Sequence, residues 1–105
     1  MESLGAYQNG ANSRFSAKKN TKPINFMFLA PQAKSVAVAG DFNNWDAAAH
    51  PLTRAVDGGW HGQIPLSHGH HRYLFIVDGQ PALDPRAQGT VRNERNEKVS
   101  MISIS

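Results

Sequence analysis

Apolar and polar residues alternate with a period of two along much of the chain from residue 23 onward. Residues 24–29 (INFMFL) place Ile and Phe at every second position, and residues 35–39 (SVAVA) alternate valine with alanine. Residues 60–66 (WHGQIPL) bring one tryptophan, one isoleucine and one leucine to a common face. Such alternation predicts β-strands that each bury one face.

Further segments extend this pattern. Residues 72–77 (RYLFIV) are apolar on both faces, as in a central strand, and the Asp78-Gly79 pair that follows predicts a tight hairpin into a short return strand at residues 80–83. In residues 99–104 (VSMISI) the apolar pattern shifts phase, which predicts a bulge or a strand buried on both faces. No window has helical periodicity. Six or seven short strands separated by turn residues predict an all-β fold, a β-sandwich.

Residues 1–22 differ from the rest in composition. They are rich in Asn, Ser, Gly and Lys and lack periodicity, so we expect a disordered basic arm before a single domain at residues 23–105. The net charge of +3 belongs to this arm, because acidic and basic side chains balance in residues 23–105. A neutral domain argues against nucleic acid as the partner.

The sequence has neither a secretory signal nor an apolar segment long enough to cross a membrane, which predicts a soluble protein with no membrane partner. The absence of cysteine excludes disulfides and thiolate sites, and it fits a cytoplasmic location.

Residue patterns of catalytic sites are also missing. No nucleophile elbow, phosphate-binding glycine loop or zinc-protease helix motif occurs. His68, His70 and His71 form the densest group of ionisable side chains, but neighbouring residues of a strand point to opposite faces and no carboxylate or thiol stands at ligand spacing. We therefore expect no enzyme activity, no metal site and no cofactor.

Two stretches are specific when taken together. The first is VAVAGDFNNWD at residues 36–46, followed by PLTR at 51–54, and the second is GHHRYLFIVDGQPALDP at 69–85, with DGGW between them. In this order they resemble family 48 of the carbohydrate-binding modules, which precede the catalytic domains of branching enzymes and isoamylases and occur in the β-subunit of AMP-activated protein kinase. The resemblance spans Ile24 to the C-terminus.

The resemblance implies an immunoglobulin-like (early-set) β-sandwich that binds α-1,4-linked glucose chains, such as glycogen or maltooligosaccharides, without catalysis. Trp45 matches the family's first stacking tryptophan and directly follows Asn43 and Asn44. Trp60 shares a face with the apolar residues of its strand, so we assign it to the core or its rim, and we expect Phe42 to plug the core below the loop.

This chain departs from the family pattern at two positions of the implied binding face. Pro81 stands where glycogen binders have a second tryptophan, and Leu74 stands where a lysine is common. The late loop reads RNERNEK, in which Asn96 or Asn93 would face the sugar. Loss of one stacking platform predicts weak binding. The site predicted in this way consists of Asn43, Asn44, Trp45, Arg72, Leu74, Gln80, Pro81 and Asn96.

A second function remains open. Leu74 and Pro81 make the implied binding face less polar and give it apolar contact area. This favours a protein-interaction module with a degraded sugar site. Such a module would dock to a carbohydrate-metabolism enzyme in trans or associate with itself.

Overall fold

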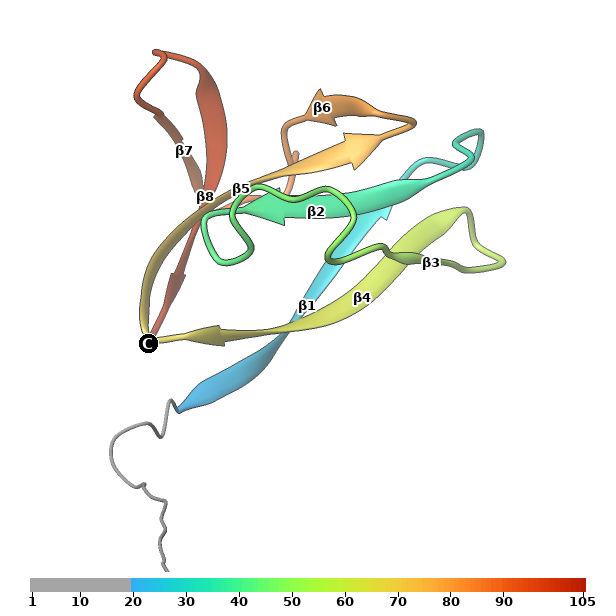
Figure 1. Cartoon of the computed structure of the whole chain (residues 1–105). Helices are drawn as coiled ribbons and strands as arrows, with labels where there is room; N and C mark the ends of the chain where they lie inside the picture. The colour runs from blue at the N-terminus through green and yellow to red at the C-terminus, as the bar shows by residue number, and fades with distance from the viewer. Residues whose placement is uncertain (1–19) are drawn as a thin grey trace, which may run out of the picture.

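The structure, a computed structural model, describes residues 20–105 as eight β-strands in two antiparallel sheets that pack face to face (Figure 1). The first sheet has the order β1-β4-β3, and its strands are β1 (Thr21–Leu29), β4 (Gly59–Ser67) and β3 (Thr53–Arg54). The second sheet has the order β2-β5-β8-β7, and β6 also pairs with β5. Its strands are β2 (Val36–Gly40), β5 (Gly69–Val77), β6 (Gln80–Ala82), β7 (Gly89–Arg92) and β8 (Lys98–Ile104).

This architecture confirms the all-β sandwich, and it has eight strands where six or seven were predicted. Strand β3 has only two residues, and β7 contains a single large apolar side chain, Val91, so neither is long enough to show alternation. The described part of the chain has no helix of the length and apolarity that a membrane crossing requires.

The boundary between arm and domain differs slightly from the prediction. Thr21 and Lys22 belong to β1, because they pair with the end of β4 and the Lys22 ammonium donates a hydrogen bond to the carbonyl oxygen of Ser105 (2.7 Å). The predicted disorder of the rest of the arm, residues 1–19, concerns residues outside the described part of the chain.

Strand β5 is paired along both edges. Residues Tyr73–Val77 pair with β2 on one side, and on the other side β8 covers the first half of the strand and β6 covers the second. The predicted turn after β5 is confirmed, with positive φ angles at Asp78 (51°) and Gly79 (84°). The central position predicted for this strand is therefore confirmed as well.

The core lies where the inner face of β1 meets the inner face of β5. The Phe26 ring packs edge-on against Tyr73, with centroids 5.1 Å apart, and Phe28 lies 4.8 Å from Phe75. Trp60 is 7% exposed and its indole N–H donates to the Ala30 carbonyl (3.0 Å), which confirms its place in the core.

In β8, Val99 and Ser100 are both fully buried, and pairing with β5 and β7 continues without interruption. Of the two alternatives for this strand, burial on both faces is correct at this point. The Ser100 hydroxyl accepts a hydrogen bond from the backbone N–H of Asp84 (2.9 Å), so it fixes the segment that follows β6.

Asp84 also accepts a hydrogen bond from Tyr73, the one tyrosine of residues 20–105, which is buried. The Tyr73 hydroxyl donates to Asp84 Oδ2 (2.6 Å), and burial, the hydrogen bond and the nearby carboxylate together raise the pKa of Tyr73 well above its usual value of 10.0. The folded protein therefore holds this proton more tightly than the unfolded chain does.

Tyr73→Phe tests this arrangement. At neutral pH we expect a loss of about 1–2 kcal/mol in the free energy of unfolding, because the Asp84 carboxylate loses its donor. The stabilisation by Tyr73 is complete below pH 10 and declines as the pH rises beyond that value toward the folded-state pKa. Urea unfolding between pH 7 and about pH 11 should accordingly show a difference between wild type and variant that shrinks with rising pH. A constant difference would contradict the assignment.

Candidate functional site

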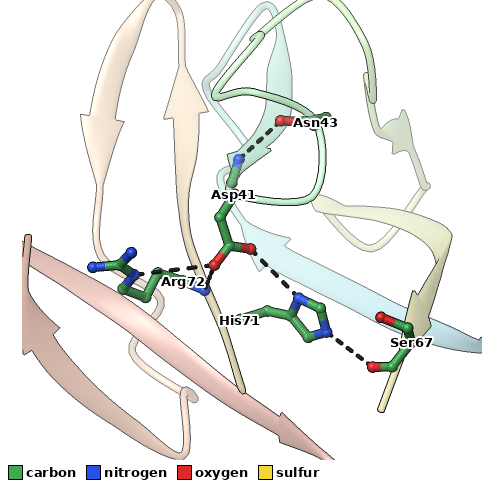
Figure 2. Close-up of polar contacts among 6 residues, drawn as sticks. Asp41, Asn43, Ser67, His71 and Arg72 are labelled. Atoms are coloured by element: carbon green, nitrogen blue, oxygen red, sulfur yellow. Dashed lines mark hydrogen bonds and ion pairs between the residues drawn. The ribbon is translucent and has the colours of Figure 1, made fainter. Parts of the chain in front are cut away.

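The loop of residues 41–46, called here the platform loop, is held by one side chain at its centre. Asn43 Oδ1 accepts the backbone N–H of Gly40 (3.0 Å), and Asn43 Nδ2 donates to the Val38 carbonyl (3.0 Å) and to His50 Nδ1 (2.8 Å). Figure 2 shows the first of these contacts. The oxygen and the NH2 group of the Asn43 side chain are thus both bonded within the protein, which gives this residue a structural role in the loop.

The platform loop presents Trp45 in a conformation that L-residues seldom adopt. Asn44 and Trp45 have φ angles of 57° and 59°, in the left-handed region, and neither is glycine. The Trp45 N–H donates to the Gly40 carbonyl (2.8 Å), which closes the turn. Left-handed non-glycine residues cost about 1–3 kcal/mol each and persist only where the surroundings impose them. The backbone at Trp45 is therefore held in one conformation by the loop itself.

Gly40 allows the loop to fold back closely. A Cβ at this position would lie 2.5 Å from the Phe42 ring and 2.7 Å from the Arg72 carbonyl oxygen, so a larger residue would displace both. Phe42 is half-buried and contacts Phe26 of the core, with ring centroids 6.3 Å apart. This confirms the predicted role of Phe42 as a plug beneath the loop.

Asp41 joins the platform loop to β5. Its N–H donates to the Arg72 carbonyl (3.0 Å), and its carboxylate accepts the Arg72 N–H (3.1 Å), as Figure 2 shows for the carboxylate. The side chains of β5 alternate, so Tyr73 and Phe75 enter the core while Arg72 and Leu74 lie on the outer face. Trp45 and the outer face of β5 therefore adjoin.

The turn between β7 and β8 supplies the opposite wall. Asn93 Oδ1 accepts the N–H groups of Arg95 and Glu97 (2.9 Å each), and Asn96 takes a left-handed φ of 65°. Arg92 donates to the carbonyl of Asn96 (2.7 Å). Because the Asn93 side chain accepts backbone N–H groups of the turn, it fixes the shape of this polar turn.

These three elements enclose a surface hollow of about 480 Å³, called here the Trp45 hollow. It is lined by Asn44, Trp45, Arg72, Leu74, Asn93, Glu94, Arg95 and Glu97. Trp45 is 39% exposed and is the one exposed aromatic side chain of residues 20–105. The hollows beside β1, beside His71 and beside Pro81 have no exposed Phe, Tyr or Trp ring in their walls.

The structure brings together four of the eight predicted site residues: Trp45, Asn44, Arg72 and Leu74. Pro81 lines a neighbouring hollow of about 210 Å³ that shares Leu74 with the Trp45 hollow. The side chain of Asn43 is turned inward, and Gln80 and Asn96 line neither hollow. Sequence reasoning missed Glu94, Arg95 and Glu97, although they belong to the RNERNEK run.

The two adjacent histidines of β5, His70 and His71, lie on opposite faces, as predicted. His70 is exposed and contacts the Ser103 hydroxyl (2.9 Å), whereas His71 faces Asp41 and Ser67. Within residues 20–105, no three His, Cys, Asp or Glu side chains are placed so that they could hold a metal ion.

Comparison with known proteins matches residues 4–98 to the sequence model of one family, carbohydrate-binding module 48 (isoamylase N-terminal domain). The chain is 44% identical over 55 residues to a 1,4-alpha-glucan branching enzyme of Nitrobacter winogradskyi, covering 52% of this chain and 8% of that enzyme. It is 39% identical over 72 residues to one from Xanthomonas oryzae pv. oryzae, covering 64% of this chain and 10% of the enzyme. The chain thus spans about a tenth of the length of these relatives.

Asn43→Ala tests the support of the platform loop. The substitution removes three hydrogen bonds of a half-buried side chain, and we expect a loss of about 2 kcal/mol in the free energy of unfolding. The backbone N–H of Trp45 should also exchange with solvent at least tenfold faster, because the turn that protects it opens. Hydrogen exchange followed by NMR measures both effects. Asn93→Ala, which alters the other polar turn, serves as the control and should leave the Trp45 amide unchanged.

Proposed function

The chain belongs to the carbohydrate-binding module 48 family, and on that premise we propose that it binds α-1,4-linked glucan chains at the Trp45 hollow without catalysing their reaction. The observation that carries the proposal is the exposure of Trp45. The other aromatic side chains of residues 20–105 are buried or half-buried, while this one stands at the mouth of a hollow on a rigid loop.

A rigid indole suits a sugar ring for two reasons. The flat aromatic face covers the apolar C–H face of a pyranose, which removes apolar surface of both partners from water. The left-handed conformation imposed on the Trp45 backbone means that little backbone entropy is lost when a ligand binds. Leu74 extends the apolar floor along the outer face of β5.

The rest of the lining suits an uncharged polyol. The lining contains two cationic side chains, Arg72 and Arg95, and two anionic ones, Glu94 and Glu97, so the charges of the hollow balance. Together with Asn44 they offer donors and acceptors for sugar hydroxyls. A phosphate-rich ligand such as nucleic acid would meet as much negative as positive charge there, which supports a neutral glucan instead.

The open form of the hollow supports binding rather than catalysis. Glu94 and Glu97 are the carboxylates nearest to the proposed sugar, and both are exposed on a surface turn. General acid catalysis by a carboxyl group requires burial or a close charged partner that keeps it protonated near neutral pH.

Replacement of the platform provides the first test of binding. We expect Trp45→Ala to weaken binding to glycogen and amylose at least tenfold, because loss of a stacked indole removes about 1.5–2 kcal/mol of contact. Affinity electrophoresis in gels with increasing polysaccharide concentration measures the dissociation constant of wild type and variant.

Val56→Ala is the matched control for this experiment. Val56 is a fully exposed apolar residue in the β3–β4 turn, outside the Trp45 hollow, and its removal should leave retention unchanged. Equal retention of wild type and Trp45→Ala would exclude this hollow as the glucan site. Free migration of the wild type at high polysaccharide concentration would exclude glucan binding itself.

A gain-of-function variant tests the effect of the missing second platform. Pro81 is exposed, its strand β6 covers only the end of β5, and its hollow adjoins that of Trp45 through Leu74. We expect Pro81→Trp to strengthen glycogen retention about tenfold, because a second ring then stacks on the same chain. The double variant Trp45→Ala/Pro81→Trp should lose most of this gain. An unchanged affinity in Pro81→Trp would contradict the arrangement of the two hollows along one ligand.

One observation favours a second function, that of a protein-interaction module. Leu83 is 39% exposed beside Pro81 and Leu74, so the smaller hollow has a largely apolar rim. A carbohydrate-metabolism enzyme or a second copy of this chain would cover it. Two results together would support this function over the first. The wild-type protein would not bind glycogen, and the Leu83→Ser variant would lose the self-association or partner binding that the wild type shows.

A further inference from the structure

The carboxylate of Asp41 lies at the edge of β5 and reaches both faces of the second sheet (Figure 2). One oxygen, Oδ2, accepts the Arg72 N–H at 3.1 Å and lies 4.0 Å from the Arg72 guanidinium Nε. Arg72 lines the Trp45 hollow, and Asp41 is the first residue of the platform loop. Asp41 therefore connects the two elements that form the proposed binding site.

The other oxygen of Asp41 faces a histidine. Asp41 Oδ1 lies 3.4 Å from His71 Nδ1, and His71 Nε2 lies 2.9 Å from the carbonyl oxygen of Ser67 (Figure 2). A carbonyl and a carboxylate oxygen both only accept hydrogen bonds, so a ring nitrogen must carry a proton to donate to either of them. A neutral imidazole has one N–H and leaves a lone pair against one of the two oxygens, whereas the protonated ring satisfies both.

The surroundings of His71 leave Asp41 as its charged partner. The His71 side chain is 13% exposed, and the Phe42 ring packs edge-on against it, with centroids 6.1 Å apart. The hollow on this side is lined by residues from β1, the platform loop, β4 and β5, among which Asp41 is the one charged side chain besides a protonated His71. Arg72, the neighbour of His71 in the chain, lies on the opposite face of β5.

We propose that protonation of His71 strengthens ligand binding at the Trp45 hollow, with Asp41 as the positioning residue that transmits it. The inference rests on the proposed glucan-binding function. Protonated His71 holds Asp41, and Asp41 then fixes Arg72 and the start of the platform loop. Loss of the proton removes the charged partner of Asp41 Oδ1 and leaves the carboxylate with Arg72 alone, so the ligand meets Asp41 and Arg72 in a less firmly held arrangement. Glucan affinity consequently falls as the pH rises.

The affinity of the full chain for maltoheptaose, measured by titration calorimetry between about pH 5.5 and about pH 8, tests this coupling over the range in which histidines exchange their proton. We expect about fivefold weaker binding at the upper end for wild type, the lower limit of typical site-to-site coupling. His71→Gln, which cannot titrate, should bind with an affinity independent of pH.

His61→Gln is the matched control. His61 also faces a carboxylate, with Nε2 3.7 Å from Asp57 Oδ1, but it lies in β4 outside the Trp45 hollow, so the wild-type pH dependence should persist. Asp41→Asn supplies an independent variant should His71→Gln fail to fold. Its amide accepts the Arg72 N–H and donates to neutral His71, so the pH dependence should flatten or reverse. A wild-type dependence retained in Asp41→Asn overturns the proposal.

The two proposals fail in different ways. Glucan binding that is equally strong across the pH range overturns the coupling and leaves the binding function intact. Absence of binding at every pH overturns the binding function, and NMR without sugar then decides the coupling. In that experiment the Arg72 amide and the Trp45 indole signals should shift together with the His71 ring as the pH changes, and signals that do not follow His71 overturn the coupling.

Discussion

The pairing of β5 along both edges is the constraint on which the rest of the structure depends. Hydrogen bonds to β2 on one side and to β8 and β6 on the other fix the register of this strand, and with it the face on which each side chain lies. Tyr73 and Phe75 then meet the aromatic side chains of β1, while Arg72 and Leu74 face solvent. A shift of one residue would exchange these two sets, so core and site depend on the same register.

The platform loop completes the site at an energetic cost that its anchors offset. Two successive left-handed residues, Asn44 and Trp45, are unfavourable by themselves, and the hydrogen bonds of Asn43 together with the Phe42 plug hold them there. Part of the folding free energy of the sandwich thus offsets the strain of the loop that carries the Trp45 indole ring. This arrangement suits the proposed glucan site, since a ligand with few contacts cannot also order its receptor.

The apolar pattern along the chain was sufficient to predict the sandwich, the central strand and the place of Trp60 in the core, the Asp78-Gly79 pair predicted the turn, and the family resemblance singled out Trp45. The pattern could not reveal what Asn43 does, because an asparagine in a polar loop has the same sequence signature whether it bonds a ligand or its own backbone. Nor could it place Glu94, Arg95 and Glu97. Their position follows from the pairing of β7 with β8, and β7 is too short and too polar to be recognised by its pattern. Contacts between distant segments thus decided the part of the site that local patterns missed.

The separation of inner from outer positions in β5 and β6 has an evolutionary consequence. Leu74 and Pro81 lie on the solvent side of the second sheet and take no part in the buried core cluster. Substitutions there alter the lining of the surface hollows while the packing of Tyr73 and Phe75 stays the same. The affinity for a ligand at these hollows can therefore decrease or increase during evolution through substitutions at surface positions alone. The sandwich fold remains intact through each of those changes.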